Sequence, residues 1–253
     1  MTELKVENVS LSKDGTAVLK RVSFSVRSGE LAVMLGPNGA GKSLSLKAAL
    51  GLETGRTGSA LLGGQDTQSL TAITRARLVS YLPQTRKLAW PSRVDDLVGL
   101  GRYAHGARLG KLGEADARAV NAALKACDIA HLAKRSADTL SGGELARVHC
   151  ARAFAAEAPL LIADEPIAAL DPSHQFRIMD LFKAFVSKGG GALIVLHDIA
   201  LAAKYADRLI WMKDGEIVAD GATETTLSTQ RLSEVYGVRA DVSGRDVRML
   251  GPV

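Results

Sequence analysis

A chain of 253 residues, of which 47% are hydrophobic and 4% aromatic, can bury a full core, so its composition excludes a disordered protein. The two cysteines, Cys127 and Cys150, have no closely spaced partner, which excludes a disulfide framework and a zinc knuckle and favours buried, reduced thiols. The formal net charge of +5 suits nucleic acid, anionic lipid or polyphosphate partners, but the sequence has no arginine-rich tract and no basic run interleaved with aromatic residues.

The chain shows no pattern of a secretion signal or of a membrane helix. Residues 1–10 alternate polar and apolar side chains instead of joining a basic stretch to an apolar run. No stretch approaches the roughly 18 apolar residues that a membrane-spanning helix requires. We therefore expect a soluble protein in the cytoplasm.

The first part of the chain predicts strands followed by a loop and a helix. Apolar residues alternate over 4–9 and 22–26 and are continuous over 31–35, which is typical of a buried central strand. A glycine-rich turn follows, and then a helix over 42–50 with Gly51 as its expected C-cap. A phosphate-binding loop requires this order of strand, loop and helix.

The middle of the chain changes to helical patterns with polar faces, and we interpret residues 86–157 as a mostly helical insertion. Within it a helix is predicted over 114–127. One stripe of that helix consists of Ala115, Ala119, Ala123 and Cys127.

After the insertion, apolar runs and helical patterns alternate again, which predicts an α/β fold. The expected elements are strand 160–163, helix 173–188, strand 192–196, helix 199–206 and a hairpin of strands 209–212 and 217–219. The hairpin turn contains Asp214-Gly215, a pair that accepts the positive φ angles of a tight turn. We expect residues 222–253 to be an extension of the same domain with short helices.

A phosphate-loop motif lies between the predicted buried strand and the first helix. Its residues match the pattern G-x-x-x-x-G-K-S and are Gly36, Pro37, Asn38, Gly39, Ala40, Gly41, Lys42 and Ser43. Glycines let the backbone wrap a phosphate chain with its N–H groups pointing inward, and the helix N-terminus adds a favourable dipole. We expect Lys42 to neutralise the β- and γ-phosphates of ATP and the Ser43 hydroxyl to ligate Mg²⁺. A simple glycine-rich helix cap would explain the glycines but not the Gly-Lys-Ser sequence.

Two acids, Asp164 and Glu165, follow the apolar run 160–163. Their carboxylates are therefore expected at the sheet edge where α/β folds bind ligands. We expect Asp164 to hold Mg²⁺, directly or through water, and Glu165 to polarise the attacking water as general base. Taken without the phosphate loop, the pair would equally fit a strand end with solvated acids.

A third motif, Leu140-Ser141-Gly142-Gly143-Glu144, precedes these acids and resembles the signature of the ABC ATPase family. Ser141 and Glu144 also have the spacing of a capping box, so the segment should begin a helix whose exposed N–H groups form a second anion site. In the family, that site faces the phosphate loop of a second molecule, and a head-to-tail dimer encloses two ATP molecules. The resemblance therefore implies that Ser141, Gly142 and Gly143 bind nucleotide across a dimer.

Three further positions occur in the order typical of this family. The resemblance implies that Gln84 contacts Mg²⁺ and the attacking water, that His197 contacts the γ-phosphate, and that the loop at Asp171 crosses the dimer interface. Alone, each has a simpler interpretation: a loop amide, a histidine at a strand end, and an N-cap before a proline. Their joint order favours the family interpretation.

The resemblance extends over nearly the whole chain and implies one domain, residues 1–253. Its fold would be a P-loop NTPase core of the ABC ATPase type, with a mainly parallel sheet, an N-terminal antiparallel β subdomain and the inserted helical subdomain. Within the family, residues 100–105, 171–175 and 232–237 resemble importer motors for ferric siderophores, haem and cobalamin. This similarity implies ATP with Mg²⁺, a homodimer, separate permease subunits, an extracytoplasmic binding protein and a peripheral place on the inner membrane face.

Other members of the family remain as alternatives. Motors of zinc, manganese or other transporters fit nearly as well. DNA-repair ATPases of this family would need coiled-coil or zinc insertions, and translation factors would normally carry two cassettes, whereas the sequence has neither heptads nor cysteine pairs and one phosphate loop. We therefore expect no direct contact with nucleic acid.

The sequence departs from the family pattern at a few places. Lys13 stands where an aromatic ring commonly stacks on adenine, so we expect weaker discrimination of adenine. Ala146 replaces a common glutamine, and Ile167 and Ala168 replace a Thr-Ser pair. Because Ala168 lacks a hydroxyl, it cannot donate the hydrogen bond often made across the dimer interface.

Overall fold

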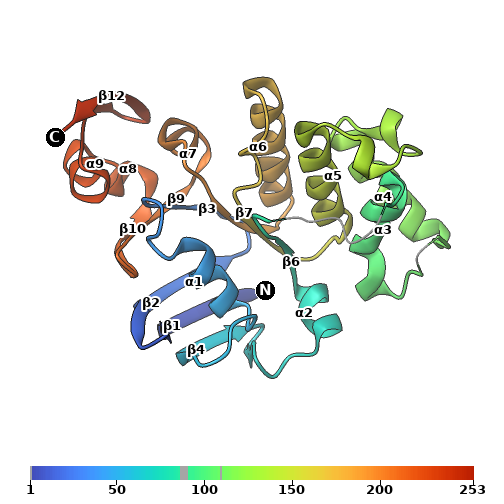
Figure 1. The fold of residues 1–253 in the computed structure, drawn as a ribbon, viewed down its shortest axis with the longest axis horizontal. Helices are drawn as coiled ribbons and strands as arrows, with labels where there is room; N and C mark the ends of the chain where they lie inside the picture. Colours follow the sequence, from blue (N-terminus) through green and yellow to red (C-terminus); the bar gives the residue numbers. More distant parts are fainter. Residues whose placement is uncertain (1, 86–90, 109) are drawn as a thin grey trace.

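The computed structural model describes residues 2–85, 91–108 and 110–253, and a six-stranded sheet runs through its centre (Figure 1). The strand order is β10-β9-β3-β8-β7-β6. Its members are β3 (Leu31–Leu35), β6 (Val79–Leu82), β7 (Leu160–Asp164), β8 (Gly191–Val195), β9 (Arg208–Lys213) and β10 (Glu216–Ala222). All pairs are parallel except β9 with β10, which confirms the predicted mainly parallel sheet.

The two faces of this sheet bury two different cores, because alternate residues of a strand point to opposite faces. In β3, Val33 and its odd-numbered neighbours pack against α6 (Pro172–Ser187) and α7 (Ile199–Tyr205). Met34 points to the other face, where α1 (Lys42–Ala49) separates the central sheet from the N-terminal sheet (Figure 1). Covering on both faces explains why the central strands read as continuous apolar runs.

The N-terminal sheet is antiparallel and has the order β2-β1-β4-β5. Its strands are β1 (Glu3–Lys13), β2 (Thr16–Arg27), β4 (Thr57–Leu62) and β5 (Gln65–Asp66). The first two contain the predicted strands 4–9 and 22–26 and are joined by a tight turn at Asp14-Gly15, both residues having positive φ. The sequence did not predict β4, which has six residues, or β5, which has two.

A helical region lies between β6 and β7, as predicted. It contains α3 (Val94–Gly99), α4 (Glu114–Ala126), α5 (Gly142–Ala155) and short 3-10 turns. Of the predicted stripe, Ala119 and Ala123 in α4 and Cys127 directly after it are buried, whereas Ala115 in the first turn is exposed. Cys127 and Cys150 are both buried, and burial raises the pKa of the Cys127 thiol. Residues 86–90, at the start of the predicted insertion, lie outside the described part of the chain.

The C-terminal segment contains the expected short helices, α8 (Thr223–Thr226) and α9 (Thr229–Tyr236). It also contains a hairpin of β11 (Val238–Ser243) and β12 (Asp246–Pro252) that the sequence did not predict. Most residues of these two strands are at least partly exposed, so they lack the apolar alternation that identifies a half-buried strand. In Figure 1 the hairpin lies beside α7, at the end of the molecule opposite the helical region.

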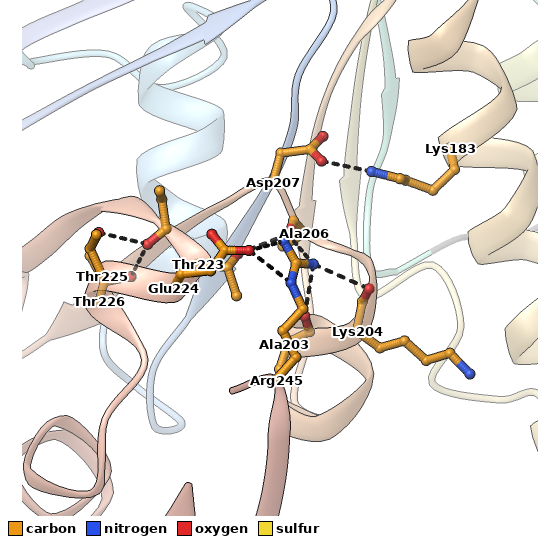
Figure 2. A network of polar contacts seen from close by, with 11 residues as sticks. Lys183, Ala203, Lys204, Ala206, Asp207, Thr223, Glu224, Thr225, Thr226 and Arg245 are labelled. Carbon is orange, nitrogen blue, oxygen red and sulfur yellow. Dashed lines mark hydrogen bonds and ion pairs between the residues drawn. The ribbon is translucent and has the colours of Figure 1, made fainter. Parts of the chain in front are cut away.

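Arg245, in the turn of this hairpin, attaches the C-terminal segment to α7 (Figure 2). Its guanidinium donates hydrogen bonds to the carbonyl oxygens of Ala203, Lys204 and Ala206 at 3.1, 3.3 and 2.9 Å. It also pairs with the Glu224 carboxylate at 2.6 Å and thereby lowers the pKa of that group. The last carbonyls of a helix have no intrahelical partner, so a cation at this place stabilises the end of α7.

Candidate functional site

The phosphate loop lies between β3 and α1, as predicted, and its glycines have conformations or contacts that side chains would not tolerate. Gly36, Gly39 and Gly41 have φ angles of 156°, 81° and 98°. A Cβ atom on Gly36 would lie 2.1 Å from the carbonyl oxygen of Met212, so no larger residue fits there without a shift. Gly41 is the N-cap of α1 and provides no side-chain cap, which leaves the first N–H groups of the helix to the loop.

Lys42 is buried, with 6% of its surface exposed, and its ammonium points back into the loop. The Nζ atom donates hydrogen bonds to the carbonyl oxygens of Gly36 at 2.7 Å and Pro37 at 2.9 Å. Burial lowers the pKa of Lys42, and the nearby carboxylates of Glu165 and Asp164 partly oppose this shift. The acids at the end of β7 therefore lie close enough to Lys42 to stabilise its charge.

Asp164 ends β7 and is buried, with 1% of its surface exposed. Burial raises the pKa of its carboxyl group, the hydrogen bond with the Ser43 side chain lowers it, and the charge of Glu165 raises it further. The structure thus joins two of the three predicted metal ligands, Ser43 from α1 and Asp164 from β7. A hydroxyl and a carboxylate together provide the oxygen ligands that Mg²⁺ prefers.

Glu165 follows directly and meets His197, which comes from the loop between β8 and α7. The His197 Nε2 atom lies 2.5 Å from Oε1 of Glu165. The glutamate side chain is 13% exposed and the histidine side chain 43% exposed. Glu165 has a φ of 50°, a left-handed conformation that is unfavourable for a glutamate and that occurs preferentially at functional sites.

A cleft of about 620 Å³ brings seven of the predicted site residues together. It is lined by Asn38, Gly39, Gly41, Lys42, Ser43, Gln84 and Glu165, together with Ala17, Val18, Leu44, Asp214 and Gly215. Gln84 is exposed in the loop after β6. Ala17, Val18, Leu44, Asp214 and Gly215 were not predicted to belong to the site. The sequence did predict the turn at Asp214-Gly215, but not that it would line the cleft. The turn is placed against the loop by a hydrogen bond from the Gly215 N–H to the Ala40 carbonyl, at 3.1 Å.

A second cleft, of about 700 Å³, lies between α6, α7 and the C-terminal hairpin. None of the predicted phosphate or metal ligands lines it within the described residues. Although this cleft is the larger of the two, the candidate nucleotide site is therefore the cleft at the phosphate loop.

The segment Ser141-Gly142-Gly143 forms the start of α5 and does not line the phosphate-loop cleft in the described part of the chain. Ser141 is the N-cap, and its hydroxyl accepts the Glu144 N–H at 3.3 Å while the Glu144 carboxylate accepts the Ser141 N–H at 2.8 Å. The predicted capping box is thus confirmed, and the Ser141 N–H lowers the pKa of Glu144. A Cβ atom on Gly142 would meet nothing within 4 Å, so this helix start is open.

Two other predicted positions have local partners. Asp171 is the N-cap of α6, where its carboxylate accepts the His174 N–H at 3.1 Å, as the simpler interpretation expected. Lys13 does not line the cleft, and its ammonium pairs with Glu53 at 3.2 Å. Residues of the following strand, Ala17 and Val18, form the cleft wall instead.

Comparisons with known proteins assign the chain to a family and agree with its fold. The family described as ABC transporter matches residues 19–168. The hemin import ATP-binding protein HmuV of Pseudomonas fluorescens is 38% identical over 240 residues, covering 93% of this chain and 92% of that protein. The cobalamin import ATP-binding protein BtuD of Halobacterium salinarum is 35% identical and covers 94% of this chain and 60% of that protein. The dimeric structure of a bacterial ABC transporter cassette has a TM-score of 0.77 at 27% identity and covers 87% of this chain and 98% of that chain.

The parallel sheet with a glycine-rich loop between β3 and α1 defines the class of P-loop nucleoside triphosphatases. Within that class the chain belongs to the ABC transporter family, and it is an ATP-binding subunit that hydrolyses ATP to drive transport. Among the described residues, no helix is both long and apolar enough to cross a membrane.

Proposed function

We propose that this chain is the ATPase of an importer for a metal chelate such as haem, cobalamin or a ferric siderophore. The names of the similar import proteins, which act on hemin and cobalamin, support this substrate class. The similarity extends over more than nine-tenths of the chain and therefore includes the C-terminal segment beyond the family match. The alternative is that the chain is the motor of a zinc or manganese importer, and the experiment below distinguishes this alternative from a chelate importer.

ATP binds in the cleft at the phosphate loop. Backbone N–H groups of residues 36–43 and the uncapped start of α1 receive the phosphates, and Lys42 exchanges its two loop carbonyls for β- and γ-phosphate oxygens. The phosphate oxygens are negatively charged, so this exchange stabilises the charged form of Lys42, whose pKa is lowered by burial. The base of ATP lies towards Ala17 and Val18, which line the cleft.

Mg²⁺ fits the oxygen groups beside the loop. Ser43, Asp164 and Gln84 would hold the ion, Asp164 directly or through water, and the existing contact between Ser43 and Asp164 supports this assignment. When bound, the ion supplies positive charge to the phosphate oxygens.

The observation that carries the catalytic assignment is the contact between Glu165 and His197 at the edge of this cleft. Glu165 acts as general base and takes a proton from the attacking water. His197 orients that carboxylate through its Nε2 atom and contacts the γ-phosphate when ATP is bound. Lys42 stabilises the charge that develops on the transferred phosphoryl group.

Two copies of the chain work together. The open helix start at Ser141, Gly142 and Gly143 does not line the cleft of its own molecule, which supports its use on the γ-phosphate of a second copy. The related dimeric cassette provides a precedent for such a pair. The loop at Asp171 would then lie near the dimer interface. Separate permease subunits and an extracytoplasmic binding protein complete the importer, which places the chain peripherally on the inner membrane face, with no direct role for nucleic acid.

The test begins with the tagged chain isolated from membranes in mild detergent together with its permease. After reconstitution in vesicles, ATP-dependent uptake is measured for haem, cobalamin, a ferric siderophore, Zn²⁺ and Mn²⁺ in parallel. We expect uptake of a chelate and of neither free ion. Uptake of Zn²⁺ or Mn²⁺ alone would reject the chelate class, and ATPase stimulation by nucleic acid instead of by the permease would reject the transport assignment.

A further inference from the structure

Tyr236, the last residue of α9, reaches the phosphate loop from the C-terminal end of the chain. Its hydroxyl oxygen accepts a hydrogen bond from the N–H of Gly36 at 2.8 Å, although the two residues are 200 positions apart. Burial raises the pKa of Tyr236 to about 12, so the hydroxyl is uncharged at neutral pH.

The end of α9 is held in place by several contacts, so the position of the hydroxyl is well defined. Leu232 and Val235 are buried in the core, and Gly237 in the left-handed conformation ends the helix directly after Tyr236. Lys213, at the end of β9, donates a hydrogen bond to the Glu234 carbonyl at 2.6 Å. The Arg245 contacts in Figure 2 attach the following hairpin to α7 as well.

Gly36 needs a partner at this point because β3 ends at Leu35 and the chain turns away from the sheet. Gly36 is buried, and an unpaired buried N–H is costly. Tyr236 supplies the acceptor that the strand pairing no longer provides. The carbonyl oxygen of Gly36 accepts a hydrogen bond from the Lys42 ammonium at 2.7 Å, so the N–H and the carbonyl of Gly36 both have partners.

We infer that Tyr236 is a positioning residue for ATP binding, acting through the first glycine of the phosphate loop. The inference rests on the proposed nucleotide site. A loop that already has its binding conformation loses less conformational freedom when ATP binds, so the hydrogen bond to Gly36 strengthens ATP binding. The C-terminal segment, which lies outside the residues matched by the family, thereby sets the nucleotide affinity of the cleft.

A purely structural role for Tyr236 would give a different result, and another tyrosine offers a matched control. Tyr205 in α7 is also buried, and its hydroxyl donates to Asp180 at 2.8 Å. It does not line the phosphate-loop cleft. The substitutions Tyr236→Phe and Tyr205→Phe remove the same single oxygen atom and keep the ring.

The experiment compares the full-length wild type with both variants by two measurements. Amide exchange of Gly36, followed by NMR on ¹⁵N-labelled protein, reports the hydrogen bond without ATP. Steady-state ATP hydrolysis and binding of a fluorescent ATP analogue report the site. For Tyr236→Phe we expect faster exchange at Gly36 and KM and Kd values about five-fold higher, the usual effect of one net hydrogen bond, with kcat changed by less than about two-fold. Tyr205→Phe should change neither exchange at Gly36 nor KM.

Three results would overturn the inference. Unchanged exchange at Gly36 would mean that Tyr236 does not hold the loop, and unchanged KM and Kd despite faster exchange would mean that the hydrogen bond does not affect ATP. An equal rise of KM in Tyr205→Phe would indicate a general loss of stability and would also reject it. If wild-type protein bound no ATP, the proposed nucleotide site itself would be wrong. Equal ATP binding by wild type and Tyr236→Phe would instead reject only the role of Tyr236.

Discussion

The imidazole of His197 contacts the carboxylate of Glu165 at 2.5 Å, and the two residues follow adjacent parallel strands. Glu165 comes directly after β7, and His197 lies just beyond β8. Since these strands are paired in register up to Asp164 and Val195, the contact is a direct result of the sheet. The sheet therefore aligns the proposed base and its orienting group without a long loop between them.

Glu165→Gln should reduce ATP turnover by at least about 100-fold, because an amide cannot accept the proton of the attacking water. ATP should still bind, so a dimer with trapped ATP should accumulate in size-exclusion chromatography with Mg²⁺. Glu114→Gln is a suitable control, since that carboxylate is exposed at the start of α4 and should leave turnover unchanged. Turnover close to that of wild type in Glu165→Gln would rule out Glu165 as the base.

His197→Ala should lower kcat by about 10- to 100-fold and change KM by less than about three-fold, because the histidine orients the base more than it binds ATP. The measurement is steady-state hydrolysis over a range of ATP concentrations. His131→Ala, an exposed histidine in the helical region, is the control. A large rise of KM with unchanged kcat would show instead that His197 mainly contributes to binding.

Gly142→Asp should distinguish ATP binding, which takes place within one molecule, from ATP hydrolysis, which requires a dimer. The Cβ atom of the new side chain would meet nothing within 4 Å, and an acid near a helix start is favourable for the helix, so the fold should not be destabilised. Its charge would repel a phosphate brought by a second copy, so turnover should fall by about 100-fold or more. Nucleotide affinity of the dilute monomer should change by less than about two-fold. Equal losses of affinity and turnover in the monomer would contradict the assignment across the dimer.

Asp164→Asn should make the fold more stable and the enzyme much less active. Burial raises the pKa of Asp164 above 3.8, so the folded state holds its proton at a higher pH than the unfolded chain does. The charged carboxylate therefore lowers the free energy of unfolding as the pH rises from 3.8 through the folded pKa. The stability gain of the variant should be small in acid, grow through this range and then level off, as measured by urea unfolding at a series of pH values.

ATPase activity of the same variant should fall by about 100-fold or more, since the charge stabilisation supplied by a metal ion is worth several kcal/mol. Asp180→Asn, which removes an exposed carboxylate on α6, provides a control for both measurements. A stability gain that was the same at every pH would show that the carboxylate charge is not its source.

Local signals predicted the elements that hold the site. The phosphate loop, the strand before Asp164 and the turn at Asp214-Gly215 all depend on neighbouring residues, so their sequence patterns were sufficient. The capping box at Ser141 was predicted for the same reason.

Contacts between distant segments could not be predicted in this way. The bond from Gly36 to Tyr236 depends on how α9 packs against β9, which no short pattern encodes. The ion pair of Lys13 with Glu53 likewise joins segments that only the folded N-terminal sheet brings together. The hairpin of β11 and β12 was missed because its strands have few buried apolar residues.

The left-handed backbone at Glu165 places stability and catalysis in opposition at one position. Glycine or asparagine adopts that conformation more readily than glutamate, so either would relieve the strain while removing the carboxylate. Directed evolution for heat resistance alone would therefore favour replacing the proposed base. A thermostable variant that still hydrolyses ATP would have to be selected for activity at each round, with residue 165 kept fixed.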